Sequence, residues 1–445
     1  MEHQALTKEK FVEILQKHES TQDVKLIKIN LKSGAEKGQN YSGLVVACHL
    51  EAEIKGQSKT YNWMAKVPLD DPNRFDMVRG TFLDKNEVIF YDELVPALKA
   101  FLVRKGSDIK LDFCPCVYTD FKEDIPREQC SLESLIIMEH LAQFGYTEPI
   151  DKKSGLDLAH VKLAIKSLAN FHATSYAFFK NKYGSVENMI EKEPILARDY
   201  FVAQPTDTFG SLMDQFNQGM LVSSLSSLSN SDANGDKYVE SYLRFAKEKM
   251  EPLKLRAQLT GPDVCKFNVL CHGDPWFNNM LFKYEDGPHG TKPVDICWVD
   301  LALTKWASPT TDISYFMYMS TTSELRKAHM NEILELYHQT LTSALNSVGE
   351  DPNLISLSEL KADYKKCSFY GFMMSFMFLP MLLARKEDVL GADEFTGDFK
   401  DPNVVADMFK MVKERIKIMM ENEPKIGHRI STGFLEMVES GYFTL

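Results

Sequence analysis

The chain has 445 residues, more than one compact domain usually holds, so two lobes of unequal size are expected. Its formal net charge is −12, which argues against a nucleic-acid partner because phosphate backbones bind to basic faces. Hydrophobic residues make up 44% and charged residues 26%, as in ordinary globular proteins.

The N-terminal segment and the cysteines bear on the compartment. Residues 1–13 are polar, and no apolar run follows them, so we expect no secretory signal. The 8 cysteines include no C-x-x-C pair, which indicates neither a zinc site nor a redox pair. We therefore expect reduced thiols in a cytoplasmic protein.

The first 140 residues predict a small sheet with one central helix. Residues 7–17 can form a short amphipathic helix. Alternation of apolar and polar residues over 44–54 predicts a half-buried strand. After a turn at 56–58, residues 59–67 return as the second strand of a hairpin.

The central helix is predicted over 79–94 and is expected to end before Pro96. Two further strands are predicted over 113–121 and 132–138. Helices dominate beyond this point.

In the second part of the chain, apolar residues recur at helical spacing from Leu158 to Phe179. Residues 223–236 are rich in Ser, Asn and Asp, which predicts an exposed loop. The short apolar runs at 266–271, 280–284 and 294–299 predict small strands that flank a loop.

The most apolar stretch is 369–384. It is shorter than the roughly 20 residues of a membrane span, and Pro380 is expected to interrupt it, so we expect a buried core helix and no membrane span. The stretch is dense in Phe and Met, and core packing is the favoured interpretation. The alternative is the wall of an apolar ligand pocket, to which flexible thioethers adapt.

The strongest chemical signal is Cys-His-Gly-Asp-Pro-Trp-Phe-Asn-Asn at 271–279. An Asp followed five positions later by Asn, on a loop between strands, suits phosphoryl transfer, in which Asp274 accepts the proton of an attacking hydroxyl and Asn279 binds Mg2+. Asp300 follows a buried strand, and a carboxylate there suits the same ion. The alternative is an ordinary turn followed by a strand-end cap.

A second signal joins Lys66 to Glu87. Glu87 interrupts the apolar stripe of the predicted helix at 79–94 and therefore needs a cation, and Lys66 projects from the sheet side that this helix would cover. Such a pair can bind the α- and β-phosphates of ATP. The alternatives are a solvated Glu87 beside an open sheet face, or Glu93 as the partner of Lys66.

A weaker signal is the turn Gly-Gln-Asn-Tyr-Ser-Gly at 38–43. Its backbone N–H groups can approach phosphates, which makes Gly38, Asn40, Tyr41 and Ser42 candidate nucleotide contacts. The segment lacks the Lys and Ser/Thr of a P-loop, and an ordinary tight turn explains it equally well.

The chain resembles the ecdysteroid kinase-like (CHK kinase-like) family, within the fold shared by aminoglycoside phosphotransferases, choline kinases and protein kinases. The resemblance runs nearly end to end. The segments that carry it are 38–43, 87–91, 138–141, 144–146, 168–173, 272–279 and 299–312.

The resemblance implies an α+β, two-lobed, protein-kinase-like fold. A small N-terminal lobe, residues 1–140, would hold an antiparallel sheet with one key helix and bind nucleotide. A larger, mainly helical lobe, residues 141–445, would bind the acceptor and carry the catalytic groups.

The resemblance also implies roles for single residues. Asp274 would be the catalytic base, Asn279 and Asp300 the metal ligands, and Lys66 and Glu87 the pair that clamps the phosphates. The co-substrate would be ATP with Mg2+, for which Mn2+ can substitute.

The linker at 138–141 would offer backbone groups to adenine, so Glu139 and Leu141 are predicted to bind nucleotide, together with Met64 on the face of Lys66. This chain departs from the family pattern at three positions: Gln39, His140 and Pro275. These departures affect nucleotide contacts and leave the predicted metal site intact.

Too few residues separate Asp300 from Asp312 for the activation segment of a protein kinase, and the D-F-G and A-P-E motifs are missing, so a protein substrate is not expected. Asp312 is predicted to be structural, either bonding the backbone of the 271–279 loop or capping a helix. His172 is predicted to be a hydrogen-bonded core histidine.

We therefore predict a kinase that transfers the γ-phosphoryl group of ATP to an alcohol, by resemblance that of an ecdysteroid-like steroid or apolar xenobiotic. A choline/ethanolamine-type or aminoglycoside-type kinase is the alternative within the class. A non-catalytic pseudokinase that binds an apolar ligand is the alternative outside it. We expect a monomer whose partners are ATP and the acceptor.

Overall fold

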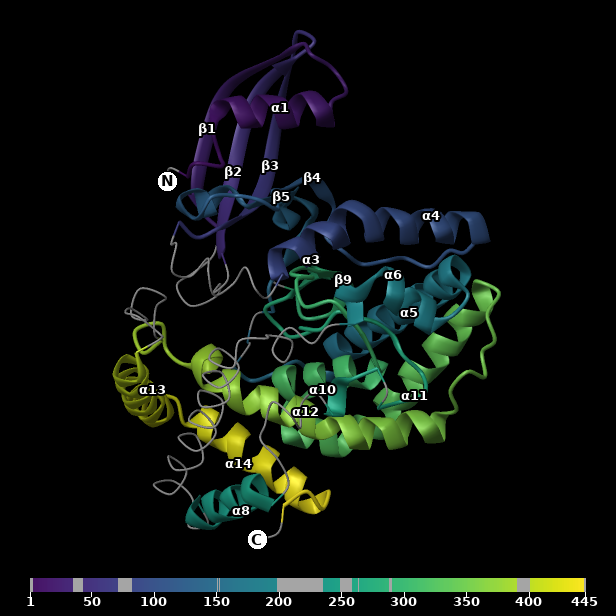
Figure 1. Cartoon of the computed structure of the whole chain (residues 1–445), viewed down its shortest axis with the longest axis vertical. Helices are drawn as coiled ribbons and strands as arrows, with labels where there is room; N and C mark the ends of the chain where they lie inside the picture. Colours follow the sequence, from purple (N-terminus) through teal and green to yellow (C-terminus); the bar gives the residue numbers. More distant parts are fainter. Residues whose placement is uncertain are drawn as a thin grey trace.

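The computed structural model describes residues 3–34, 43–70, 82–149, 151, 153–197, 235–248, 258–262, 264–287, 290–389 and 401–443. An antiparallel sheet forms the N-terminal part, and a mainly helical part follows it, as Figure 1 shows. The predicted α+β class, with the sheet first and the helices after it, is confirmed.

The N-terminal sheet has five strands in the order β1-β2-β3-β5-β4, and all neighbouring pairs are antiparallel. The bounds are β1 Val24–Ser33, β2 Gly43–Ile54, β3 Gln57–Pro68, β4 Cys116–Phe121 and β5 Ser134–Glu139. The predicted hairpin is present as β2 and β3. Strand β1 was not predicted, because it lies at the sheet edge and buries little of its length.

One face of this sheet is covered by α1 (Lys8–His18), whose Phe11 and Leu15 are buried in the same core as Trp63 and Ala65 of β3. Because side chains alternate along a strand, Lys66 lies on the opposite face. That face meets the helix that carries Glu87.

The helix expected to end before Pro96 continues through it. It runs as α3 (Leu83–Ile89), the π-helical η1 (Phe90–Leu94) and α4 (Val95–Lys105). The prediction was wrong because Pro96 directly follows the π-helical turn η1, where the regular helical hydrogen-bond pattern is already interrupted and a missing backbone N–H is tolerated.

The second part contains short strands and long helices. The strands are β6 Tyr146–Thr147, β7 Val269–Cys271, β8 Met280–Tyr284, β9 Pro293–Trp298 and β10 Lys305–Ala307, in the sheets β6-β8-β9 and β10-β7. The helices are α5 Leu158–Tyr183, α6 Val186–Lys192, α8 Gly235–Glu248, α10 Pro309–Ser320, α11 Ser323–Ser347, α12 Leu357–Leu383, α13 Pro402–Asn422 and α14 Pro424–Glu439. Short 3₁₀ turns are η2 Arg127–Leu132, η3 Leu141–Phe144 and η4 Pro194–Ala197.

The loop predicted over 223–236 lies outside the described residues up to 234, and Gly235 and Asp236 begin α8. The run at 280–284 is β8 as predicted, and the run at 294–299 is β9 with its bounds shifted by one residue.

Helix α12 contains the most apolar stretch of the chain. The predicted buried core helix is confirmed, and Pro380 lies inside this helix without ending it. The helical turn at Pro380 lacks one backbone hydrogen bond, because proline has no N–H group, and the packing around α12 stabilises this turn. By length and composition α12 could span a membrane, yet 83% of its most apolar window is buried inside the protein. Its methionines are buried among aromatic rings, as a core helix requires; they are Met373, Met374, Met377 and Met381.

Helix α12 approaches α10 closely at Gly371, where an added Cβ would overlap the Ser314 carbonyl group. We predict that Gly371→Ala lowers the free energy of unfolding by about 1–3 kcal/mol, because two packed helix backbones must separate. Guanidinium and thermal unfolding measure the effect.

Gly433→Ala in α14 is the matched control. The nearest atom to its added Cβ is a ring carbon of Phe372 at 3.7 Å, an ordinary contact. This variant should gain about 0.5–1 kcal/mol from helix propensity. Equal effects of the two substitutions would contradict the close approach.

Candidate functional site

The loop between β7 and β8 consists of residues 272–279, and its backbone is hydrogen-bonded to Asp312 of α10. The Asp312 carboxylate accepts hydrogen bonds from the backbone N–H groups of His272 at 2.6 Å and Gly273 at 3.0 Å. It also bonds to Nε2 of His172 at 3.1 Å. Burial alone would raise the pKa of Asp312, but the bonds from His172 and from the loop amide lower it overall. The predicted bond between Asp312 and the loop backbone is confirmed.

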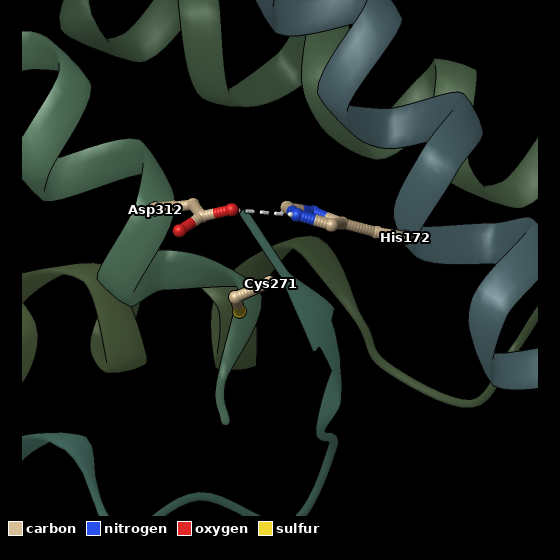
Figure 2. A group of neighbouring side chains, drawn as sticks. All are labelled: His172, Cys271 and Asp312. Atoms are coloured by element: carbon tan, nitrogen blue, oxygen red, sulfur yellow. Dashed lines mark hydrogen bonds and ion pairs between the residues drawn. The ribbon is translucent and has the colours of Figure 1, made fainter. Parts of the chain in front are cut away.

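His172, Cys271 and Asp312 lie close together, as Figure 2 shows, and their residue types alone would permit a metal ion. Each group is already bonded within the protein. His172 Nδ1 meets the Tyr337 hydroxyl at 2.8 Å, and the Cys271 thiol donates to the Ser308 carbonyl at 3.4 Å. We therefore interpret the cluster as a hydrogen-bonded support, and His172 is the core histidine that was predicted.

Gly273 is required by the geometry of this loop. Its φ is +83°, and an added Cβ would overlap the backbone carbonyl of Leu303. Only a residue without a side chain fits here, because both the conformation and the space exclude a Cβ.

Asp274 lies on this loop, and both of its carboxylate oxygens accept hydrogen bonds. The Trp276 indole N–H donates to Oδ2 at 3.0 Å, and the Asn279 amide donates to the same oxygen at 2.8 Å. The Tyr315 hydroxyl donates to Oδ1. Burial, together with the negative charge of Asp300, raises the pKa of Asp274 to about 6.

Tyr315 was missed by the sequence analysis. It follows Asp312 by three positions on α10, so the two side chains share one helix face. A search of the positions three and four residues beyond Asp312 could have found it.

Lys66, Glu87 and Asp300 form an ion triad in which Lys66 and Glu87 are buried and Asp300 is partly exposed. The Lys66 ammonium lies 2.6 Å from Glu87 Oε2 and 3.0 Å from Asp300 Oδ1. Burial opposes the charge on Lys66, but the two carboxylates raise its pKa overall. Burial raises the pKa of Glu87 to about 7 against the pull of Lys66, whereas the net effect of Lys66 on Asp300 is a lowered pKa. The predicted contact between Lys66 and Glu87 is present, and Glu93 is exposed on η1.

Asp300 follows β9 in a left-handed conformation, with φ of +61°. Such a conformation is costly for a residue other than glycine and is often found at functional sites. The chain just beyond it is tied to α3, because the Asn86 amide donates to the carbonyl groups of Ala302 at 2.7 Å and Thr304 at 3.1 Å. The helix of Glu87 and the strand end of Asp300 are thereby fixed together.

The triad forms one wall of a cavity of about 270 Å³ between the sheet, the linker after β5 and the start of β8. The lining residues are Gly34, Val45, Met64, Lys66, Glu87, Cys114, Met138, Glu139, His140, Leu141, Ala142, Glu148, Asn278, Asn279, Leu281, Val299 and Asp300.

Seven of the predicted site residues therefore meet at one cavity: Met64, Lys66, Glu87, Glu139, Leu141, Asn279 and Asp300. Asp274 does not line it but is joined to it through Asn279. Gly38, Asn40, Tyr41 and Ser42 lie outside the described residues. The apolar lining, including Val45, Leu281 and Val299, was not predicted, because each of these residues reads as an ordinary strand residue.

Asp312 and Asp157 provide a matched pair for a test of the loop support. We predict that Asp312→Ala lowers the free energy of unfolding by about 3–5 kcal/mol, because it strands buried N–H groups of the loop and of His172. Because the pKa of Asp312 is lowered in the folded protein, its carboxylate contributes to the free energy of unfolding above about pH 3.9. This contribution is lost as the pH falls through the pKa of Asp312 in the folded protein. Unfolding is therefore measured at neutral pH.

Asp157 also accepts two backbone N–H groups, as the N-cap of α5, but its side chain is 62% exposed. Asp157→Ala should therefore cost only about 1 kcal/mol. Similar losses for the two variants would show that Asp312 does not hold the loop.

Comparison with known proteins identifies one family and finds distant similarity to solved structures. The model of the ecdysteroid kinase-like family matches residues 37–350. No curated protein matches the sequence. A choline kinase from Cryptosporidium parvum Iowa II is similar over 98% of this chain and 98% of its own, with 12% identity and a TM-score of 0.40. A mutant aminoglycoside 2′-phosphotransferase-IIIa in complex with GDP is similar over 93% of this chain and 98% of its own, with 13% identity and a TM-score of 0.35.

Proposed function

Because the chain belongs to the ecdysteroid kinase-like family, we propose that it is a small-molecule kinase that uses ATP and Mg2+ and phosphorylates an alcohol. The observation that carries the proposal is the ion triad at the cavity: Lys66 lies between Glu87 and Asp300, and Asn279 lines the same space. A buried ammonium beside a strained carboxylate is the arrangement that a triphosphate with its metal ion needs.

The nucleotide would occupy the cavity of the triad. Its adenine would lie between the apolar residues Val45 and Leu281 and bond to the backbone of the linker at 138–141, while Lys66 would bind the phosphates. In this proposal residues 1–140 form the nucleotide-binding lobe, and residues 141–445 form the catalytic and acceptor-binding lobe.

Asp300 and Asn279 fit a divalent metal ion by their chemistry. A carboxylate oxygen and an amide oxygen are hard ligands of the kind that Mg2+ and Mn2+ prefer. The Asn279 side chain donates through Nδ2 to the backbone carbonyl and to Oδ2 of Asp274, and neither bond uses its Oδ1. A bound ion would supply neutralisation of the phosphate charge, and Asp300 and Asn279 would hold it.

Asp274 would be the catalytic base. It would bond to the acceptor hydroxyl, align it with the γ-phosphoryl group and accept its proton. The bonds from Trp276 and Asn279 to one oxygen fix the plane of the carboxylate, so the attacking hydroxyl is held in one direction.

The acceptor side favours an apolar alcohol. Trp276 and Tyr315 bond to Asp274, and a core of Phe and Met side chains from α12 packs behind them. Aromatic groups next to Asp274 would suit a steroid or an apolar xenobiotic better than a polycationic aminoglycoside, which would need carboxylates. Choline-type amino alcohols are the second candidate, because aromatic faces also bind quaternary ammonium groups.

The first test of this proposal is Asp274→Ala. We expect phosphoryl transfer to fall by about 10²–10⁴-fold, while the Kd of Mg·ATP stays within a few fold, because Asp274 acts on the acceptor. Candidate sterols, amino alcohols and plant phenolics are screened for ATP-dependent gain of one phosphate by mass spectrometry. A fully active Asp274→Ala enzyme would refute the assignment.

The second test is metal dependence of nucleotide binding. ATP with Mg2+ should raise the melting temperature, and ATP with EDTA should not, because Asp300 and Asn279 need the ion to hold the phosphates. Asp300→Ala should abolish most of the magnesium-dependent shift. A pseudokinase that binds only an apolar ligand predicts no shift with ATP in either condition.

A further inference from the structure

A second cavity lies on the other side of the linker from the nucleotide cavity. It has a volume of about 600 Å³, and Leu141 lines both cavities. We call it the rear groove. Its lining residues come from α4, the segment that follows it, the linker, β6, β8 and β9: Lys99, Leu102, Val103, Ser107, Ile109, Lys110, Leu111, Asp112, Phe113, Pro115, Leu141, Phe144, Tyr146, Lys283, Ile296 and Cys297.

The rear groove gathers apolar surface that faces solvent. Val103 is 80% exposed and Phe144 is 46% exposed, and both line the groove. Its floor is made of buried residues such as Leu102, Phe113 and Ile296. Exposed apolar side chains above a closed apolar floor mark a binding surface, because single scattered ones would form no such concavity.

The groove also carries three lysines, of which one is neutralised. Lys110 lies 2.6 Å from Asp295 and 3.2 Å from Asp112. Tyr146 donates to Asp295 at 2.6 Å, and Ser167 donates to Asp112 at 2.6 Å. Both carboxylates are therefore engaged on the groove wall.

The charges of the other two lysines are not compensated by a neighbouring carboxylate among the described residues. Lys99 and Lys283 are exposed, and within the part of the chain that the structure describes neither forms an ion pair. Asp295 is the cross-strand neighbour of Lys283, yet its carboxylate bonds to Lys110 and Tyr146 instead. In a chain of net charge −12, two uncompensated cations beside an apolar floor are a local exception that suits an anionic group.

We propose that the rear groove binds a free amphipathic anion, an apolar chain that ends in a carboxylate. The chain would lie over Val103 and Phe144, and the carboxylate would bond to a lysine on the groove wall, Lys99 or Lys283. The volume lies within the roughly 300–1,000 Å³ of typical ligand sites. The net negative charge of the protein opposes an anionic membrane surface as the source of this group. The inference does not depend on the proposed kinase activity.

The test titrates dodecanoate into the full chain by isothermal calorimetry below its micelle concentration, with and without Mg·ATP, so that the result does not depend on nucleotide binding. We expect one site, and weaker binding of the uncharged dodecanol. Lys99→Glu with Lys283→Glu should raise the Kd by about tenfold or more, and Val103→Asp should do the same. All three side chains are exposed, so these variants should fold.

Two exposed residues of β1 provide matched controls: Lys25→Glu and Ile27→Asp should leave the Kd unchanged. Three results would overturn the proposal. The first is that dodecanoate does not bind, and the second is that the groove variants bind it as tightly as the parent chain. The third is that, in sedimentation experiments, the only effect of the groove variants is to dissociate a dimer formed through this face.

Discussion

A buried ammonium group between two carboxylates is the interaction on which the site depends. Lys66 is only 8% exposed, and it joins β3 to α3 through Glu87 and to the end of β9 through Asp300. Charges buried in this way are tolerated only together, because the loss of one leaves another without compensation. The same triad lines the cavity, so the contacts that join the sheet to the helical part also set its electrostatic field.

Asp312 holds the loop that carries Asp274 in the same way, through buried hydrogen bonds to the loop backbone. It replaces water for two buried backbone N–H groups and one buried histidine, which holds the loop in one conformation. Gly273 lets this loop approach the backbone of Leu303, and Asn279 then links Asp274 to the cavity. The ion triad and the Asp312 cluster thus fix two sides of one site from distant parts of the sequence.

Sequence alone could predict the parts of this site whose residue types conflict with their surroundings. Glu87 within an apolar helix stripe required a cation, and Asp300 after a buried strand required a partner. Features that depend on tertiary contacts could not be read in this way. The Asn86 bonds beyond Asp300 and the edge strand β1 carry no local signal, and the position of Tyr315 beyond Asp312 gives only a weak one. Pro96 was misread because the local hydrogen-bond pattern of the helix decides whether proline ends it.

The most direct measurement is a crystal structure of the protein with Mg2+ and a non-hydrolysable ATP analogue. The account predicts a magnesium ion at about 2.0–2.1 Å from oxygen atoms of Asp300 and Asn279, with Lys66 against the phosphates and the terminal phosphoryl group facing Asp274. A nucleotide bound outside this cavity, or a metal ion that contacts neither Asp300 nor Asn279, would contradict it.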